Sequence, residues 1–340
     1  MATCFKRGLT LAIALSVAAL CLPIRALADP PADTLQNFGP NLRTQCPNPE
    51  GIAIDPTGNL YAAAVGNGHI CVISPAGVVT SNFAIPPGSG GVTVLLGELF
   101  EPSQGLYVVD IADDIGDPSG NTRHGRLLKV DPATHAVIVL ATGFAGPNAI
   151  AQDRHRNLFV SDSFLGTIFK VAPDGSSVIA WAHSSLLTTT GSPPFGANGL
   201  AFDRDEKFLY VANTGDNRVL RVPVERNGTA GAVEVFADGA TINAEQNTTQ
   251  ALHGADGIMF DIRGNLYVCA NQANEIQVLS PQASLIARYS ASGANALDFP
   301  ASLVFKGRQL FITNLSLSDG GVNSKLSVLS VPHPGLPLRP

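Results

Sequence analysis

The stretch "GADGIMFDIRGNLYVCAN", residues 254–271, sets a carboxylate directly before a short apolar run. Residues 257–260 are typical of a buried β-strand, residues 263–265 of a turn, and Leu266 begins a second apolar run. A buried charge is costly unless it has a partner, so Asp256 needs an explanation. The stretch predicts a β-hairpin whose first strand begins at a polar site.

The same pattern recurs along the chain. Three further segments superpose on it residue for residue: "PEGIAIDPTGNLYAAAVGNGHICVIS" from Pro49, "PNAIAQDRHRNLFVSDSFLGTIFKVA" from Pro147 and "ANGLAFDRDEKFLYVANTGDNRVLRV" from Ala197. A shorter copy starts at Pro300, and a divergent copy lies at residues 105–132. Units of about 45 to 55 residues, built from short strands and tight turns, have the period of a propeller blade. The sequence therefore predicts an all-β fold, a six-bladed β-propeller.

Each predicted blade is a four-stranded antiparallel sheet whose first strand lies innermost, around a central channel. The stretch "TLQNF", residues 34–38, is expected to close the ring by adding the outer strand of the last blade. A helical fold is disfavoured, because the chain lacks a long 3.6-residue periodicity after its N-terminal segment.

We name the position five residues before the recurring aspartate the slot. It holds Glu50, Asn148, Asn198 and Asp256, and we assign Ser302 to it in the last copy. Because the innermost strands converge on one axis, these side chains are expected to meet, and two carboxylates facing each other need a positive partner. Oxygen donors without sulfur or imidazole favour Ca²⁺, then Mg²⁺ or Mn²⁺, over Zn²⁺.

A second interpretation of the slot needs no metal. Asn, Asp and Glu also begin strands by binding the backbone of a turn. A non-catalytic propeller of the NHL-repeat kind, which binds partners through the same face, has a similar "P-x-G-I-A-x-D" pattern. The oxygen donor in each of the four superposed copies favours the metal, and both interpretations stay open.

At these residues the chain resembles the SMP-30/gluconolactonase family of six-bladed propellers and, more distantly, paraoxonases and diisopropyl fluorophosphatases. "PEGIAID", "ANGLAFDRDEKFLYVANT" and "ADGIMFDIRGNLYV" look like the metal-bearing segments of the family, and the resemblance covers about residues 45–330. It implies a divalent cation, usually calcium, held by Glu50, Asn148, Asn198 and Asp256, and hydrolysis of a small lactone or ester. Asp256 is then the ligand that also acts as the base or orients water. A metal-dependent propeller lyase or a strictosidine-synthase-like enzyme is the enzymatic alternative.

The N-terminus has the charge, apolar core and small-residue order of a secretory signal peptide, with cleavage predicted after residue 28. Residues 29–340 would then form a single domain, secreted or periplasmic; a membrane anchor is the alternative. Cleavage removes three positive charges (Lys6, Arg7 and Arg25) and no acid, so the net charge changes from −6 to −9. Such a charge disfavours nucleic acid and membranes as partners, so a small-molecule substrate is expected. The oligomeric state stays open, with a monomer favoured.

Three further features carry weaker predictions. Cys46 and Cys71 can pair in an oxidising compartment, which leaves Cys269 as a buried thiol. The long segment "DIADDIGDPSGNTRHGR", residues 110–126, is either a substrate lid, with Arg123 and His124 as contacts, or a solvated acidic loop. His253 is either a proton shuttle at the channel mouth or a turn residue.

Overall fold

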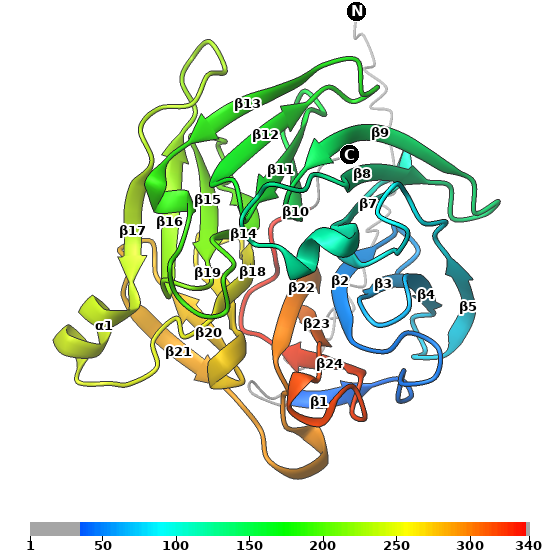
Figure 1. Cartoon of the computed structure of the whole chain (residues 1–340). Helices are drawn as coiled ribbons and strands as arrows, with labels where there is room; N and C mark the ends of the chain where they lie inside the picture. The colour runs from blue at the N-terminus through cyan, green and yellow to red at the C-terminus, as the bar shows by residue number, and fades with distance from the viewer. Residues whose placement is uncertain (1–34, 338–340) are drawn as a thin grey trace, which may run out of the picture. The chain divides into compact units, whose positions relative to one another are not determined.

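The computed structural model describes residues 35–337, so the predicted signal peptide lies outside the described residues. These residues form six four-stranded antiparallel sheets arranged around one axis (Figure 1). The predicted six-bladed propeller is confirmed, and each blade places its first strand next to the axis.

The strands of blade one are β2 (Pro49–Ile54), β3 (Leu60–Ala64), β4 (His69–Ile73) and β5 (Val79–Ala84). Those of blade two are β6 (Leu95–Glu101), β7 (Gly105–Asp110), β8 (Gly125–Val130) and β9 (Val137–Phe144). Blade three has β10 (Pro147–Gln152), β11 (Leu158–Asp162), β12 (Thr167–Val171) and β13 (Val178–His183). Blade four has β14 (Ala197–Phe202), β15 (Phe208–Asn213), β16 (Arg218–Pro223) and β17 (Glu234–Asp238). Blade five has β18 (Ala255–Phe260), β19 (Leu266–Ala270), β20 (Glu275–Leu279) and β21 (Leu285–Tyr289). Blade six has β22 (Pro300–Lys306), β23 (Gln309–Asn314), β24 (Lys325–Ser330) and, from the N-terminal side, β1 (Leu35–Phe38).

Both ends of the described chain build blade six. Strand β1 pairs antiparallel with β24, with Leu35 opposite Leu329 and Phe38 opposite Leu326. The predicted closure of the ring by the N-terminal segment is confirmed. Because β1 completes the sheet of blade six and the chain then continues into blade one, the β1–β24 backbone hydrogen bonds close the ring.

The core consists of apolar layers between neighbouring blades. One such layer joins Tyr61 and Ile70 of blade one to Leu95, Leu106 and Val108 of blade two, all of them buried. Burial of a large apolar side chain contributes about 1.5–3 kcal/mol, so these layers fix the angle between blades. The layers leave the channel-facing edge of each innermost strand free for other side chains.

Small residues directly after the slot let the innermost strands approach closely. A Cβ atom at Gly199 would lie 2.3 Å from the Asp256 carbonyl oxygen, and one at Gly51 would lie 2.2 Å from the Leu96 carbonyl oxygen. Both distances are far below van der Waals contact, so a side chain at either position would push two blades apart. Glycine here brings neighbouring slot residues together.

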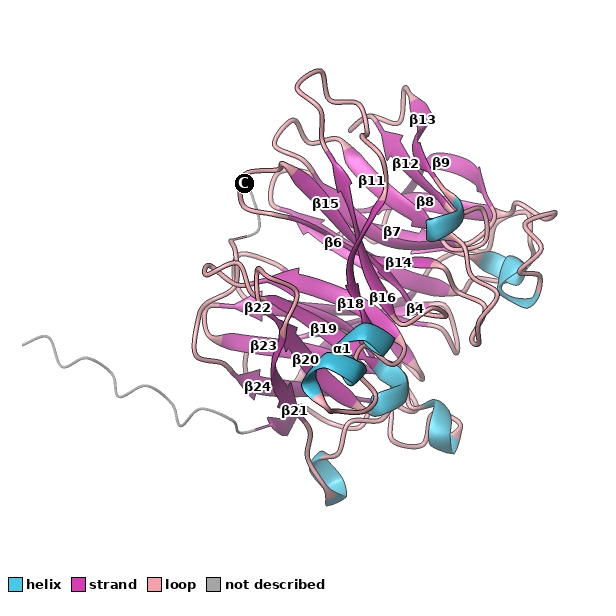
Figure 2. Cartoon of the chain, turned by 90° about the vertical axis from the view of Figure 1, so that its left-hand side faces the viewer, coloured by secondary structure: helices cyan, strands magenta, loops and turns pink. Residues whose placement is uncertain are grey.

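The helical segments gather on one face of the propeller, as Figure 2 shows. They are η1 (Ala112–Gly116), η2 (Ser185–Leu187), α1 (Gly239–Gln246), η3 (Asn271–Ala273), η4 (Gly293–Asn295) and η5 (Leu317–Asp319). Each lies between the second and third strands of a blade or between two blades, which are the connections at the end where the innermost strands begin. Among the described residues, none of the helices has the length and apolarity needed to cross a membrane.

A disulfide joins Cys46, in the segment before β2, to Cys71 in β4. Cys269 is buried as a free thiol in β19. The sequence allowed this pairing without determining it, and the disulfide fastens the segment before β2 to blade one.

Candidate functional site

All six innermost strands carry a β-bulge at the slot. In blade one, Pro49 lies opposite Ala64 and Ile52 lies opposite Ala62, so two inner residues face Ala63 alone. The same shift occurs in the other five blades. A bulge bends its strand and redirects the side chain that it carries. The fold therefore presents one redirected side chain per blade at the same level of the channel.

The slot is polar in four blades and apolar in two. Glu50, Asn148, Asn198 and Asp256 occupy it in blades one, three, four and five, each only 4–5% exposed. The equivalent residues are Leu96 in blade two and Ala301 in blade six, both buried. The four predicted residues thus hold equivalent places in the ring, with Glu50 between the two apolar slots.

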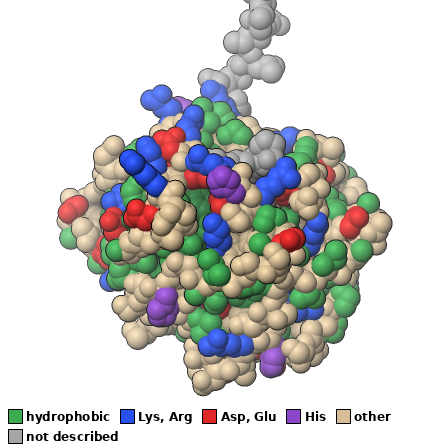
Figure 3. Space-filling model, turned by 90° about the horizontal axis from the view of Figure 1, so that it is seen from above, with side chains coloured by type: hydrophobic (Ala, Val, Ile, Leu, Met, Phe, Trp, Pro, Cys, Tyr) green, Lys and Arg blue, Asp and Glu red, His purple; other side chains and the backbone are tan. Residues whose placement is uncertain are grey.

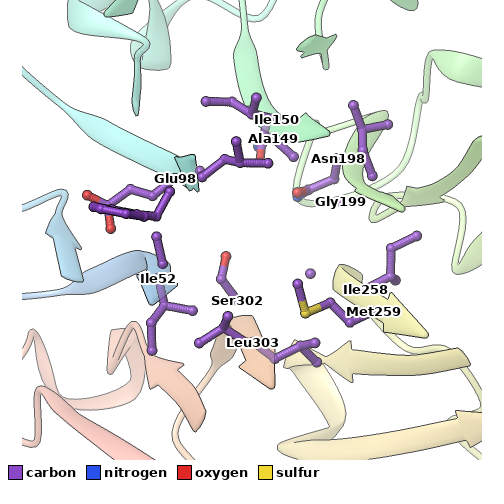
Figure 4. A pocket seen from close by; sticks show the side chains of 18 residues that line it. Ile52, Glu98, Ala149, Ile150, Asn198, Gly199, Ile258, Met259, Ser302 and Leu303 are labelled. Carbon is purple, nitrogen blue, oxygen red and sulfur yellow. The ribbon is translucent and has the colours of Figure 1, made fainter. Parts of the chain in front are cut away.

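The assignment of Ser302 to the slot is wrong by one residue. Strand β22 pairs Pro300 with Asn314 and Leu303 with Ile312, which puts Ala301 in the place that Glu50 has in blade one. Blade six has Lys306 instead of the recurring aspartate, so the sequence lacks the marker that sets the offset. The Ser302 hydroxyl points into the channel instead (Figure 4).

Glu50 and Asp256 influence each other electrostatically. Burial raises the pKa of Glu50 well above its usual value, and the charges of Asp256 and Glu98 raise it further. Burial raises the pKa of Asp256 to about 7, although hydrogen bonds from Asn271, Asn198 and the Gly257 backbone act in the opposite direction. Two buried carboxyl groups that resist ionisation lack a positive partner among the described residues around them.

Atoms of both carboxyl groups are left without hydrogen bonds. Glu50 Oε2 and Asp256 Oδ1 are buried and have no partner among the described residues. Asn198 donates its Nδ2 to Thr214 Oγ1 at 2.9 Å, so its amide oxygen is the atom that it can offer to a ligand. Buried carboxylate oxygens beside amide oxygens form the donor set of a hard divalent cation. The residues present therefore fit the cation that the family resemblance implies.

Asn271 is a member of the site that the repeat pattern did not identify. Its Nδ2 donates to Asp256 Oδ2 at 2.8 Å, and both side chains are buried. Asn271 directly follows β19, at the place of Ser163 after β11 and Thr214 after β15. Ser163 and Thr214 donate to the backbone carbonyls of the next blade. Blades three, four and five share a polar residue directly after the second strand, whereas blade one has Val65 there, and this partial pattern is the signal that could have located Asn271.

Behind the slots the channel is mainly apolar. Ile52, Ile150, Ile258 and Leu303 line a cavity of about 80 Å³ (Figure 4). Glu98 also lines it, and burial raises the pKa of its carboxyl group well above the usual value, which favours the neutral acid. At the opposite end, a pocket of about 570 Å³ is lined largely by apolar side chains. Polar groups are thus concentrated at the slot end.

The segment 110–126 connects β7 to β8, as predicted, and begins beside the slot of blade two because Asp110 pairs with Leu95. Asp110 is fully buried and accepts hydrogen bonds from Arg126 Nε at 3.0 Å and from the Val94 backbone at 2.9 Å. The segment is therefore anchored at its base, which the solvated-loop interpretation does not anticipate. Its role as a lid remains a prediction.

His253 precedes β18 and is half-buried. Its Nδ1 is buried and has no hydrogen-bond partner among the described residues. The His253 backbone donates to Gln250 and accepts from Gln272, as expected of a turn residue. Its role as a proton shuttle stays a prediction.

Comparisons with known proteins agree with this architecture. Residues 172–316 match the model of the SMP-30/gluconolactonase/LRE-like region. That region includes Asn198 and Asp256, whereas Glu50 and Asn148 precede it. No curated protein matches the chain.

Among solved structures, regucalcin from Agrobacterium tumefaciens, described as a calcium-binding protein, has a TM-score of 0.64 at 17% identity over 90% of this chain and 96% of that one. A luciferin-regenerating enzyme has a TM-score of 0.65 at 16% identity, with coverage of 90% and 98%. The gluconolactonase XC5397 from Xanthomonas campestris has a TM-score of 0.59 at 17% identity, with coverage of 88% and 95%. At these identities the structures support the fold.

The family match and the fold agree with the repeated motifs. Residues 172–316 are similar to the SMP-30/gluconolactonase/LRE-like region, the family that the slot segments resemble, and the described chain forms a six-bladed β-propeller.

Proposed function

We propose that this propeller is a divalent-cation-dependent hydrolase of a lactone or a related ester, with Ca²⁺ as the native ion. The observation that carries the proposal is the pair Glu50 and Asp256: two buried carboxyl groups that repel each other when charged, each with an oxygen that lacks a hydrogen bond. The family match and the similarity to a calcium-binding regucalcin and a gluconolactonase support it.

Glu50, Asn148, Asn198 and Asp256 would hold the cation, which would polarise the substrate carbonyl as a Lewis acid. The chain keeps the ligands in place before the substrate arrives. Thr214 accepts from the Asn198 amide, and its own hydroxyl donates to the Ala255 carbonyl at 2.8 Å. This link ties the slots of blades four and five together and fixes the Asn198 amide plane.

Asp256 is proposed to orient the attacking water or accept its proton. Asn271 donates to Oδ2, so Oδ1, which has no hydrogen bond, is the oxygen left for the cation and for a water molecule beside it. A group that accepts a proton near neutral pH works best when its pKa is near the working pH. Burial moves the pKa of Asp256 to about 7, and a bound cation would lower it again.

A binding module of the NHL kind explains the slot less well. Such a protein needs polar residues there only to bind turn backbones. The free oxygens of Glu50 and Asp256 do not serve that purpose, and buried carboxyl groups lower stability when they ionise. The presence of these buried carboxyl groups therefore favours a bound ligand over a role in binding turn backbones.

We further propose that the protein is exported, acts as a monomer and takes a small-molecule substrate, without a nucleic-acid or membrane partner. A disulfide such as Cys46–Cys71 is typical of an oxidising compartment, which supports a secreted or periplasmic location. Basic and acidic side chains are interspersed on the face that Figure 3 shows, so that face does not present a basic patch for a polyanion.

The test is a hydrolysis assay on the full chain with a panel of lactones and aryl esters, with and without a chelator. Hydrolysis that stops with chelator, returns with Ca²⁺ and is absent in Asp256→Asn supports the proposal. Asp205→Asn is the matched control, because Asp205 is an exposed carboxylate outside the site. Products that lack the added water would indicate a lyase, and chelator-resistant or absent turnover would contradict the proposal.

A further inference from the structure

The segment 110–126 contains a second cluster of ligand-type side chains, away from the slot residues in sequence. Asp113, Asp114 and His124 each offer a ligand atom, and these atoms all lie within 4.8 Å of one another. His124 Nδ1 lies 2.7 Å from Asp113 Oδ1 and 3.3 Å from Asp114 Oδ1. One imidazole nitrogen and two carboxylate oxygens therefore converge on a small volume.

The Asp114 carboxylate is oriented from behind. Its Oδ2 accepts the backbone N–H groups of His124 at 2.5 Å and Gly125 at 3.1 Å. Its Oδ1 accepts no hydrogen bond from any described residue, although the side chain is fully buried. A buried oxygen without a hydrogen bond is costly, and here it faces His124. One oxygen thus fixes the carboxylate and the other points into the cluster.

The surrounding chain keeps this arrangement in place. Asp110 and Arg126 form a buried ion pair at the base of the segment, and Arg126 also donates to the Pro86 carbonyl at 2.9 Å. On the other side, a Cβ atom at Gly90 would lie 2.3 Å from Asp113 Oδ1, so the backbone there packs directly against this carboxylate. The cluster is enclosed on two sides, while Asp113 and His124 stay partly open to solvent.

We propose that Asp113, Asp114 and His124 form a second metal site for a borderline divalent ion such as Zn²⁺. This site is distinct from the slot ring, the name used here for Glu50, Asn148, Asn198 and Asp256. One nitrogen and two oxygen ligands suit such an ion, with the remaining position open to water. Ligand atoms about 2.1 Å from a tetrahedral ion are about 3.4 Å apart. The Asp114–His124 pair already has nearly this spacing, and the Asp113–His124 pair needs to open by less than about 1 Å.

The alternative is an ion pair without a metal, in which a protonated His124 is shared by the two carboxylates. The hydrogen bond that the His124 ring donates to Asp113 raises the pKa of His124, in line with such a pair. The two states compete, since a metal displaces the proton from the imidazole. A metal titration distinguishes them.

The experiment is a Co²⁺ titration of the full chain in excess Ca²⁺, followed by visible absorption, and then displacement by Zn²⁺. We expect one equivalent of Co²⁺ with d–d bands of a low-symmetry site, and binding at least about tenfold weaker in both His124→Ala and Asp113→Asn. Both variants alter partly exposed side chains, so they should fold. His155→Ala is the matched control, because His155 is an exposed histidine of another blade.

Three results would overturn the proposal. Equal Co²⁺ affinity in wild type and His124→Ala would place the ion elsewhere, and no saturable binding in wild type would leave only the ion pair. Loss of Co²⁺ binding in Glu50→Gln, with His124→Ala unaffected, would assign the ion to the slot ring. Because the readout is metal binding and not turnover, the result does not depend on the proposed hydrolysis.

Discussion

The slot ring and the cluster in segment 110–126 each bring ligand-type side chains together around a buried carboxylate, but from different parts of the fold. Both contain a buried carboxylate with an oxygen that lacks a hydrogen bond, in Asp256 and in Asp114. The slot ring collects oxygen donors from four blades, whereas the cluster takes its ligands from one connection and adds an imidazole. Each site has two carboxylates, so their number does not distinguish the sites. The other donor atoms, amide oxygens in the slot ring and an imidazole nitrogen in the cluster, should decide which ion each site prefers.

The largest effect is expected from the carboxyl groups of the slot ring. Glu50→Gln or Asp256→Asn should lower lactone hydrolysis by about a thousandfold or more, because the change removes an anionic ligand from a centre worth several kcal/mol in the transition state. Steady-state kinetics at saturating Ca²⁺ checks this. Activity within tenfold of wild type would show that the slot ring is not the catalytic site, and the contrast with the cluster in segment 110–126 would then lose its basis.

The second effect is a pH dependence of stability in the cation-free protein. The pKa of Asp256 is about 7 in the folded chain and 3.8 in the reference state, so between these values the folded chain binds more protons than the unfolded chain. The free energy of unfolding should therefore fall as pH rises from about 4 to about 7, by an amount on the order of a few kcal/mol. Glu50 shifts in the same direction.

Urea unfolding in chelator at pH 5 and pH 8 measures this slope. Asp256→Asn should reduce the slope of stability against pH and make the cation-free protein more stable at pH 8. The same change removes an anionic ligand and should therefore weaken cation binding. A variant less stable than wild type at pH 8 would mean that the Asp256 charge is compensated within the fold.

A smaller loss is expected at Asn271, which donates a hydrogen bond to Asp256 and is not one of the four proposed ligands. Asn271→Ala should weaken Ca²⁺ binding and lower turnover by about 10- to 100-fold, in the range of residues that orient a metal ligand. Asn271→Asp keeps the shape of the side chain but adds a carboxyl group beside Asp256. Its main effect should be a shift of the pH profile of turnover, with a smaller loss of Ca²⁺ affinity than in Asn271→Ala. Calorimetry and kinetics on both variants decide the matter; unchanged affinity in Asn271→Ala would make the 2.8 Å contact structural only.

The smallest effect should come from the loop cluster on the slot ring. His124→Ala is expected to leave Ca²⁺ affinity and lactone turnover within about twofold of wild type, because each site has its own donor set. A larger change would mean that segment 110–126 also contacts the substrate, as the lid interpretation holds.

The sequence was sufficient for the blades and for four slot residues because a marker accompanies them. The aspartates Asp55, Asp153, Asp203 and Asp261 hold the turn after each first strand, so counting back five residues gives the slot. Asp261, for example, accepts the Arg263 and Asn265 backbone N–H groups. Blade six lacks the marker, and its slot was therefore misplaced at Ser302.

Other features depend on contacts that a repeat pattern does not encode. Leu96 occupies the slot of blade two, but the repeat pattern identified this copy only at residues 105–132 and therefore missed its first strand. The pairing of Asn271 with Asp256 bridges the two strands of a hairpin across its bulge. In segment 110–126, the sequence shows the acidic residues and His124 but not their partners. The structure shows that Asp110 forms an ion pair with Arg126, whereas Asp114 lies with His124 in the cluster.

The most direct test of the slot ring is a calorimetric Ca²⁺ titration of the full chain, with Glu50→Gln as the variant that keeps the shape of the side chain. The account predicts one Ca²⁺ per wild-type chain at the slot ring and no measurable binding in the variant. Equal binding in both proteins, or none in wild type, would contradict the claim that the buried carboxyl groups of Glu50 and Asp256 exist to hold a cation.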